Sequence, residues 1–369
     1  MRTRIAVSAA LGLGLVFGAG APALSSNLSA PATASTKASA TASTNLSAAV
    51  TPGQELEPIT DGKISKGDTA YVDVTVATLW KDPKSPRTVD KPALGKPVDL
   101  DKWNKDLAGT EVRRGLTGKA DTQATYGSQV TVLETKGDWT KVAVTDQSTP
   151  KNKKGYPGWL PTKQIVENDR FGKLKKDQPR AVVKAKKTEL EGVEFTKDTG
   201  ADPSFNVELP LIAQDVEDVR VALPGGGAAW IDVKDVNVFD IGEKPKKPSG
   251  DDLVKTAKQF DGLRYLWAGV SAYGFDCSGF TYSIYRAHGI DIPRDSGDQA
   301  KAGKKVSSKN LKPGDLLFFS TSSGTVHHVG MYIGGGKMIH SPNASKTVYV
   351  VDWKKWDKGN EFSGARRIL

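Results

Sequence analysis

Two low-complexity stretches divide this chain, so it cannot fold around one continuous core. Residues 25–50 are dominated by Ala, Ser and Thr, and residues 243–250 have the sequence Glu-Lys-Pro-Lys-Lys-Pro-Ser-Gly. The first stretch buries too little apolar surface to offset its ordering entropy, and the second has the composition of a linker. A chain of 369 residues is also too long for one ordinary core. We therefore expect a disordered tether over residues 24–64, a linker over residues 243–250, and separate folded domains around them.

The first 23 residues are predicted to be a secretion signal. Arg2 and Arg4 precede an apolar run over residues 5–21, and Ala21-Pro22-Ala23 offers a cleavage site of small residues. A membrane anchor is the alternative, but glycines interrupt the run and no positive charge follows it directly. No other run is long and apolar enough to span a bilayer. We expect a secreted protein, extracellular or associated with the cell wall, with no stable membrane span after signal removal.

Export makes the cysteine content informative. Cys277 is the only cysteine, so no internal disulfide can form. It is either a small buried hydrophobe or a working thiol, and its surroundings must decide between the two.

The formal net charge of the chain is +10. Outside the cell, this charge favours anionic wall polymers or lipid head groups as partners rather than nucleic acid. The lysines are scattered along the sequence, so plain solubility is the alternative.

Short strands separated by turns are predicted between residues 68 and 166. Residues 71–76, 129–133 and 139–144 are strand candidates, and the last two flank Gly137-Asp138, a strong hairpin signal. Residues 155–161 contain too many helix breakers for anything but a strand edge or a turn. Many short strands with dense turns are typical of a small barrel or sandwich.

Aromatic residues and glycines recur together in this region. Tyr126-Gly127, Gly137-Asp138-Trp139 and residues 155–159 together resemble the SH3-like barrels of bacterial wall hydrolases. Residues 181–239 are similar and end in a tryptophan-bearing segment, residues 229–233. We therefore expect two small all-β SH3-like barrels, the first over residues 65–168 and the second over residues 169–242.

Cys277 lies in the first turn of a predicted helix over residues 277–288. Asp276 is a suitable N-cap, and Gly289 is a stop signal. Unpaired backbone N–H groups and the helix dipole favour negative charge at this position. A helix N-terminus with a nearby imidazolium lowers a thiol pKa by several units, so we expect an activated nucleophile here.

A predicted hairpin carries three of the four histidines. His288 ends the cysteine helix, too far from Cys277 to serve as its base, whereas the others lie in residues 326–333 and 337–340. Strand alternation places His327 on an apolar, core-like face and His328 on the opposite face, which is open beside a glycine. If the three glycines between the strands form the loop, His340 lies diagonally beside His328, and a shift of one residue separates them. A thiol, a base and a third group that orients the base suit a thiol peptidase, and a buried cysteine with a structural hairpin is the alternative.

Residues 251–369 contain a series of motifs in a fixed order. They are Tyr265-Leu266-Trp267-Ala268-Gly269, Asp276-Cys277-Ser278-Gly279-Phe280, Ile292-Pro293-Arg294-Asp295-Ser296, Pro313-Gly314-Asp315, His328-Val329-Gly330-Met331-Tyr332 and Met338-Ile339-His340-Ser341-Pro342. Over nearly its whole length, this segment resembles the NlpC-type cysteine peptidases. Ala268 is a departure, since the family often has a second glycine there.

The resemblance implies an α+β papain-like C-terminal catalytic domain and assigns roles within it. Cys277 would attack, His328 would take its proton, and His340 would orient His328. Tyr265 would help to hold the oxyanion, with a core tyrosine as the alternative. The positions that line the substrate cleft in the family correspond to Trp267, Asp276, Ser278, Asp295 and Ser296. A plain helix cap at Asp276 and a plain core residue at Trp267 remain open. A diamino-acid substrate carries an ammonium group, and an Asp295 carboxylate near the thiol could pair with it.

The family cleaves the amide between γ-linked D-glutamate and the next diamino acid in peptidoglycan stem peptides. We predict this activity here, through a thioester and without a metal or organic cofactor; His-Glu-x-x-His, Gly-x-Ser-x-Gly and phosphate-loop motifs are absent from the sequence. Two barrels before the peptidase resemble enzymes whose first barrel closes one end of the cleft and selects a free N-terminal L-alanine. Tyr156 and Trp159 are candidates for that role, but the sequence does not place them. The alternatives are a wall amidase or other thiol acyl-transfer enzyme on the same scaffold, and a non-catalytic wall-binding protein.

Overall fold

The computed structural model describes residues 62–194 and 200–369. These residues all belong to one compact unit, Ala49–Leu369. The predicted secretion signal, residues 1–23, and the predicted tether up to residue 61 lie outside the described residues. In the part of the chain that the structure describes, no helix is long and apolar enough to cross a membrane.

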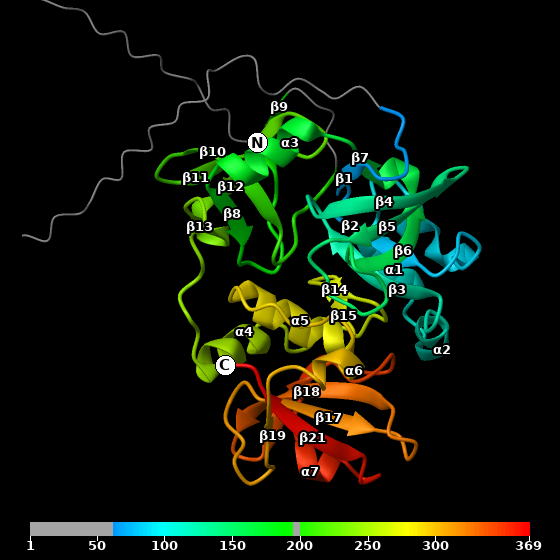
Figure 1. The fold of residues 1–369 in the computed structure, drawn as a ribbon, viewed down its shortest axis with the longest axis vertical. Helices are drawn as coiled ribbons and strands as arrows, with labels where there is room; N and C mark the ends of the chain where they lie inside the picture. Colours follow the sequence, from blue (N-terminus) through cyan, green and yellow to red (C-terminus); the bar gives the residue numbers. More distant parts are fainter. Residues whose placement is uncertain (1–61, 195–199) are drawn as a thin grey trace, which may run out of the picture. The chain divides into compact units, whose positions relative to one another are not determined.

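The first barrel is built on a sheet of short antiparallel strands with the order β3-β2-β6-β5-β4-β1-β7 (Figure 1). Its strands are β1 (Thr69–Val72), β2 (Val76–Trp80), β3 (Ala120–Thr125), β4 (Gln129–Lys136), β5 (Trp139–Val144), β6 (Tyr156–Pro161) and β7 (Ile165–Val166), with the 3-10 helix η2 (Thr162–Gln164) before the last. Val130 and Val132 on β4, and Val142 and Val144 on β5, are fully buried, because alternate side chains of a strand point to the same face.

The β4–β5 hairpin confirms the turn predicted at Gly137-Asp138, since Lys136 pairs with Trp139. Residues 155–161 are expected at a strand edge or in a turn, but β6 is an interior strand between β5 and β2. The prolines of β6 are tolerated because it pairs with β2 only at Trp80–Trp159, so few of its N–H groups are needed on that side.

Short helices interrupt the barrel between β2 and β3, and the strand pattern does not predict them. They are η1 (Thr88–Leu94, a 3-10 helix), α1 (Leu100–Asp106) and α2 (Thr110–Arg114). Asp99 caps α1 by accepting a hydrogen bond from the N–H of Lys102, and Trp103 of this helix is buried. The buried Arg113 donates to the carbonyl oxygen of Tyr265 at 2.9 Å. The insertion therefore reaches the C-terminal domain.

The second barrel follows helix α3 (Asp169–Asp177) and has the strand order β13-β8-β10-β11-β12-β9. Its strands are β8 (Arg180–Val183), β9 (Glu191–Glu194), β10 (Glu208–Gln214), β11 (Asp218–Ala222), β12 (Ala228–Asp232) and β13 (Val236–Phe239), with the 3-10 helix η3 (Val233–Asp235) before β13. Trp230 lies on β12 and pairs with Arg220 of β11, as the predicted tryptophan-bearing strand requires.

The C-terminal domain has the predicted α+β architecture, with helices packed on an antiparallel sheet of order β16-β21-β17-β18-β19-β20 (Figure 1). Its helices are α4 (Gly250–Lys258), α5 (Cys277–Ala287), α6 (Ser296–Gln299) and α7 (Trp353–Trp356). Its strands are β14 (Val270–Ser271), β15 (Gly274–Phe275), β16 (Lys304–Val306), β17 (Leu316–Ser320), β18 (Val326–Gly334), β19 (Lys337–His340), β20 (Tyr349–Asp352) and β21 (Phe362–Arg367). Leu253 of α4 and Ile284 of α5 share a core with Val329, whereas Phe319 packs with Trp353 in a separate cluster. The alternation of the strands thus gives each face of the sheet its own core.

Both barrels share apolar cores with the C-terminal domain. Leu266 and Tyr273 belong to the same buried cluster as Trp80 of the first barrel. From the second barrel, the Phe205 ring lies edge-on to the Phe260 ring, with centroids 4.9 Å apart. The barrels therefore help to support the loops that lead to Cys277. The domain boundaries given above remain predictions.

Gly155 is a position where a side chain should be damaging. Its φ is +125°, and a Cβ there would collide with the carbonyl oxygen of Val144. We predict that Gly155→Ala lowers the free energy of unfolding by more than about 2 kcal/mol, because the backbone has to shift. The matched control is Gly137→Ala, where φ is +55° and a Cβ meets no atom within 4 Å; we expect a loss of about 1 kcal/mol there. Urea denaturation measures both losses, and equal values would contradict the prediction.

Candidate active site

Cys277 is the first residue of helix α5, as the sequence predicts. The Asp276 side chain caps this helix by accepting a hydrogen bond from the N–H of Gly279 at 2.6 Å. The cysteine is partly exposed. Its sulfur accepts a backbone hydrogen bond from Val329, the residue after His328. The start of α5 therefore meets strand β18 beside the predicted base.

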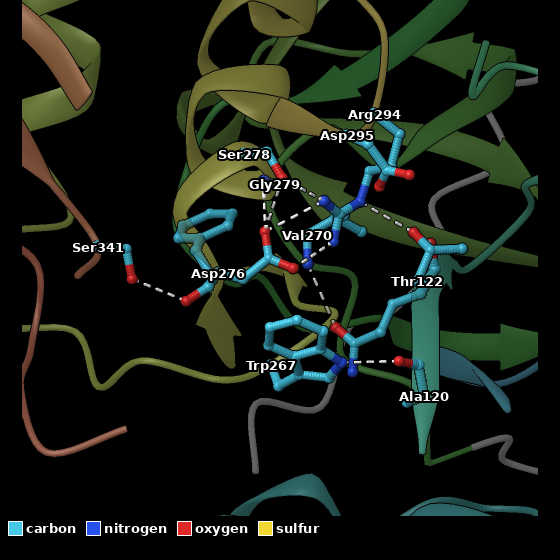
Figure 2. A network of polar contacts seen from close by, with 12 residues as sticks. Ala120, Thr122, Trp267, Val270, Asp276, Ser278, Gly279, Arg294, Asp295 and Ser341 are labelled. Carbon is cyan, nitrogen blue, oxygen red and sulfur yellow. Dashed lines mark hydrogen bonds and ion pairs between the residues drawn. The ribbon is translucent and has the colours of Figure 1, made fainter. Parts of the chain in front are cut away.

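A buried arginine joins the residues on both sides of Cys277 (Figure 2). Arg294 Nη2 donates to Asp276 Oδ2 at 2.6 Å, and Nη1 donates to Ser278 Oγ at 2.9 Å. Its Nε donates to Thr122 Oγ1, on strand β3 of the first barrel, at 3.0 Å. Arg294 is 1% exposed, so its charge depends on the Asp276 carboxylate for compensation. This network positions Asp276 and Ser278 and attaches the first barrel to the site.

The β18–β19 hairpin brings His328 and His340 together. Met331 pairs with Ile339, and in this register His340 falls opposite Gly330, as predicted. The turn differs from the predicted three-glycine loop, because Gly334 pairs with Lys337 and a bulge between Tyr332 and Gly334 restores the register. His328 Nε2 and His340 Nδ1 lie 2.9 Å apart. The space beside Gly330 is not open: a Cβ there would press on Met338 and His340.

His327 does not lie in the core, so that expectation is wrong. Its side chain is 38% exposed and faces Glu361, with Nε2 and Oε2 3.3 Å apart. A register shift between Phe319 and Ser320 places a bulge on β18 at this point. The bulge breaks the alternation of side chains on which the assignment of His327 depends.

Aromatic rings surround the histidine pair. The Trp356 ring centroid lies 5.0 Å from that of His328 and 4.9 Å from that of His340. Phe319 lies beside His328, and Tyr349 lies beside His340. These rings restrict the orientations of both imidazoles and exclude water from them.

Burial governs the ionisation of the candidate triad. Desolvation, followed by the charge of Asp276, raises the pKa of Cys277 to about 12. Desolvation, followed by His340 and then His327, holds the pKa of His328 well below its usual value. Burial lowers the pKa of His340 to about 3.

The thiol pKa thus shifts opposite to the direction expected from the helix N-terminus. The backbone hydrogen bonds from Val329 and Ser278 do lower this pKa, but desolvation outweighs them. The expected imidazolium is also missing, because burial keeps His328 neutral. Both pKa shifts favour the neutral form of each group, and the role of His328 as the acceptor of the thiol proton remains a prediction.

Tyr265 and Trp267 lie on the segment before Cys277. Tyr265 is 6% exposed; desolvation, followed by the charge of Cys277, raises the pKa of its hydroxyl well above the usual value. This tyrosine remains protonated and is available as a hydrogen-bond donor. Trp267 Nε1 donates to the carbonyl oxygen of Ala120 at 2.7 Å (Figure 2). Trp267 therefore also links the first barrel to the segment before Cys277. Its role in substrate binding remains a prediction.

Asp295 meets residues of the first barrel. The Tyr156 hydroxyl donates to Asp295 Oδ2 at 2.9 Å, and Lys151 Nζ pairs with the same oxygen at 2.9 Å. Ser296 follows as the first residue of α6. Trp159, on the opposite face of β6 from Tyr156, packs in the core of the first barrel. Of the two barrel candidates, Tyr156 is the one that contacts a predicted substrate-binding residue.

Two residues of the site, Arg294 and Trp356, are not assigned a role from the sequence. Arg294 lies inside a predicted motif, directly before Asp295, but nothing local indicates that its partner is Asp276. Trp356 has no motif around it. It reaches the histidines because β20 pairs with β19 and α7 follows β20 directly.

Across residues 62–194 and 200–369, no group of three or more His, Cys, Asp or Glu side chains could hold a metal ion.

Comparisons with known proteins indicate one family. Residues 262–365 match the model of the NlpC/P60 family, and residues 183–239 match the YKFC SH3b2 domain. The gamma-D-glutamyl-L-lysine dipeptidyl-peptidase of Bacillus cereus (strain ATCC 10987 / NRS 248) is 44% identical over 308 residues, which cover 82% of this chain and 92% of the relative. The Bacillus subtilis (strain 168) protein of the same name is 36% identical over 298 residues, which cover 80% of this chain and 97% of that relative. The crystal structure of an NlpC/P60 family protein from Bacillus cereus ATCC 10987 is similar with a TM-score of 0.79 and 43% identity, covering 82% of this chain and 100% of that one.

His340 is expected to act by positioning His328. We predict that His340→Ala lowers kcat at least about tenfold, because His328 loses the acceptor that holds its ring. KM should stay within about twofold, since the substitution touches no substrate group. The matched control is His327→Ala, which removes an exposed neighbouring imidazole and should change neither constant. Steady-state kinetics of the three proteins checks this, and equal effects of both substitutions would contradict it.

The acid limit of activity should lie below the usual range of histidine. His328 acts as a base only when neutral, so activity is present above its pKa and is lost as the pH falls through it. Burial holds this pKa well below 6.5. We therefore predict that kcat/KM, measured from pH 4 to 9, falls on the acid side with a midpoint below 6.5. A midpoint at or above that value would show that His328 is not desolvated as described.

Proposed function

The chain belongs to the NlpC/P60 family, and on this premise we propose that it is a secreted peptidoglycan hydrolase that cuts wall stem peptides. The proposed bond is the amide between γ-linked D-glutamate and the diamino acid that follows. The observation that carries the proposal is the meeting of Cys277, at the start of α5, with the strand that bears His328. A partly exposed cysteine at a helix start, in contact with the strand that carries a buried imidazole, suits a thiol acyl-transfer enzyme.

Attack begins with a proton transfer from the thiol to His328. The 2.9 Å contact suits a hydrogen bond from His328 Nε2–H to His340 Nδ1, which leaves His328 Nδ1 free to act as the base. The thiol proton moves to Nδ1 while the sulfur bonds to the γ-carbonyl carbon of D-glutamate. His340 has to remain a neutral acceptor during this step, and its pKa of about 3 supports that state.

The tetrahedral intermediate then collapses as the C–N bond breaks. His328 returns its proton to the departing amine of the diamino acid, and a γ-D-glutamyl thioester remains on Cys277. Water, deprotonated by His328, attacks this thioester carbon. The C–S bond breaks, the carboxylic acid leaves, and the proton on His328 restores the thiol.

Tyr265 is the proposed side-chain donor to the negative oxygen of the intermediate. The charge of Cys277 contributes to its raised pKa, so its hydroxyl lies within electrostatic range of the reacting sulfur. Because this hydroxyl keeps its proton, it can donate a hydrogen bond to an oxyanion. Its buried surroundings strengthen such a bond by excluding water.

The substrate is proposed to carry a free N-terminal amine, which Asp295 and Tyr156 bind. Asp295 follows Arg294, whose side chain contacts both neighbours of Cys277. Tyr156 reaches it from the first barrel. This barrel-side location favours the amine of an N-terminal L-alanine over the side chain of the diamino acid. The names of both Bacillus relatives, gamma-D-glutamyl-L-lysine dipeptidyl-peptidase, support release of a dipeptide and L-lysine as the diamino acid.

The location of the protein is part of the proposal. The relatives belong to a family of wall hydrolases, and export through residues 1–23 would deliver the enzyme to that substrate. The net charge of +10 is suited to the anionic polymers of the wall, which we propose as additional contacts.

Digestion of defined peptides tests the proposed function. We expect the wild-type protein to convert L-Ala-γ-D-Glu-L-Lys into L-Ala-D-Glu and lysine, and the N-acetylated peptide to react at least about tenfold more slowly, because the amine loses its charge-assisted hydrogen bonds. Cys277→Ala should form no product. Mass spectrometry identifies the bond that is cut. Cleavage at another amide, or product formation by the Cys277→Ala variant, would overturn the proposal.

A further inference from the structure

A lysine of this same chain lies in the position proposed for the substrate amine. Lys151 Nζ pairs with Asp295 Oδ2 at 2.9 Å. The same nitrogen contacts the Tyr156 hydroxyl and lies over the Tyr156 ring, 4.3 Å from its centroid. A carboxylate, a phenol oxygen and an aromatic face are the groups that bind an ammonium ion. Asp295 and Tyr156 therefore bind the Lys151 side chain as they would bind the ammonium group of a ligand.

The segment that carries Lys151 is attached to the C-terminal domain. It joins β5 to β6, over residues 145–155. The N–H of Arg294 donates to the carbonyl oxygen of Ser148 at 3.2 Å, and Asp146 forms an ion pair with Arg286. With the backbone held in this way, the Lys151 side chain can leave Asp295 by rotation about its own bonds.

Charges of both signs surround Asp295, since Asp121 lies within electrostatic range of Asp295, Lys151 and Arg294. Asp295 also accepts a hydrogen bond from the Tyr156 hydroxyl, and the buried Arg294 cation precedes it in the chain. Arg294 is paired with Asp276, so a second ammonium group at Asp295 Oδ2 and the Tyr156 ring chiefly meets the Lys151 ammonium, which already occupies that position. The substrate amine and the lysine ammonium therefore exclude each other.

We propose that Lys151 is an internal competitor for the amine-binding position, and that it sets how tightly this enzyme binds peptides with a free N-terminus. The proposal rests on the proposed function, because it takes Asp295 as the partner of the substrate amine. The Lys151 side chain is 47% exposed and that of Asp295 is 32% exposed. An ion pair this accessible to water is weak, so the lysine lowers affinity by about two- to fivefold and does not block binding.

Removing the lysine should therefore tighten binding. In a Cys277→Ala background, which prevents turnover, Lys151→Met is expected to lower the Kd for L-Ala-γ-D-Glu-L-Lys by about two- to fivefold. Lys151→Arg retains a cation and should stay near the starting value. The matched control is Lys153→Met, which removes an exposed lysine from the same segment and should leave Kd unchanged. Isothermal titration calorimetry measures each Kd.

The sign of the change in Kd in Lys151→Met decides whether Lys151 competes with the substrate or binds it. If Lys151 binds a carboxylate of the peptide, Lys151→Met raises Kd, and the inference is overturned. An unchanged Kd also overturns it. The N-acetylated peptide has no ammonium group to compete, so its Kd should not fall in Lys151→Met; an equal gain for both peptides would indicate a general loss of charge repulsion and contradict the inference.

Asp295→Asn separates failure of this inference from failure of the proposed function. If Asp295 binds the amine, this variant raises Kd for the free peptide and removes the preference over the acetylated one. Loss of that preference without tighter binding in Lys151→Met would overturn the lysine inference alone. If Asp295→Asn keeps the preference, the proposed assignment of the amine is wrong, and the inference fails with it. Thermal unfolding of each variant confirms that the fold is retained.

Discussion

The buried ion pair between Arg294 and Asp276 is the interaction on which the site depends. Asp276 caps the helix that begins with Cys277, the proposed nucleophile, and Arg294 also bonds Ser278 and the barrel residue Thr122. Burial is the largest single cause and lowers the pKa of Arg294, but the charge and hydrogen bonds of Asp276, together with Asp295 and Tyr156, raise it overall. Loss of either partner would leave an unpaired buried charge, at a cost of about 3–5 kcal/mol. The same ion pair thus fixes the cap of α5, helps to position Cys277 and links the first barrel to the C-terminal domain.

The proposed chemistry starts from a desolvated thiol and a desolvated imidazole. Each group alone resists ionisation, since burial raises the pKa of Cys277 and lowers that of His328. Transfer of one proton between them leaves the net charge of the pair at zero and avoids an isolated buried charge. Rings such as Trp356 surround the histidines, which favours the proposed transfer of the proton within the pair. The helix terminus at Cys277 then stabilises the thiolate once it forms.

The local elements of the site could be predicted because their signals are short in sequence. Asp276 as an N-cap and Cys277 in the first turn follow from adjacent residues, and the register that places His340 beside His328 follows from the β18–β19 hairpin. The prediction for His327 fails because a bulge depends on the partner strand β17, which lies elsewhere in the sequence. The interior position of β6 is missed for a similar reason, since its neighbour β2 is distant in the chain.

The sequence by itself determined the helix that begins at Cys277 and the histidine hairpin, because each depends on contacts between residues close in the chain; the nucleophile and the domain boundaries remain predictions from contiguous motifs. Only the tertiary structure decided that Arg294 compensates Asp276, that Trp356 encloses the histidines, and that Tyr156 and Lys151 of a barrel meet Asp295. The two members of each contact are separated in the sequence. Their burial in the folded protein affects which of the ionisable groups carry a charge. Desolvation is a property of the packed molecule, so the direction of the thiol pKa shift could not be obtained from the helix pattern alone.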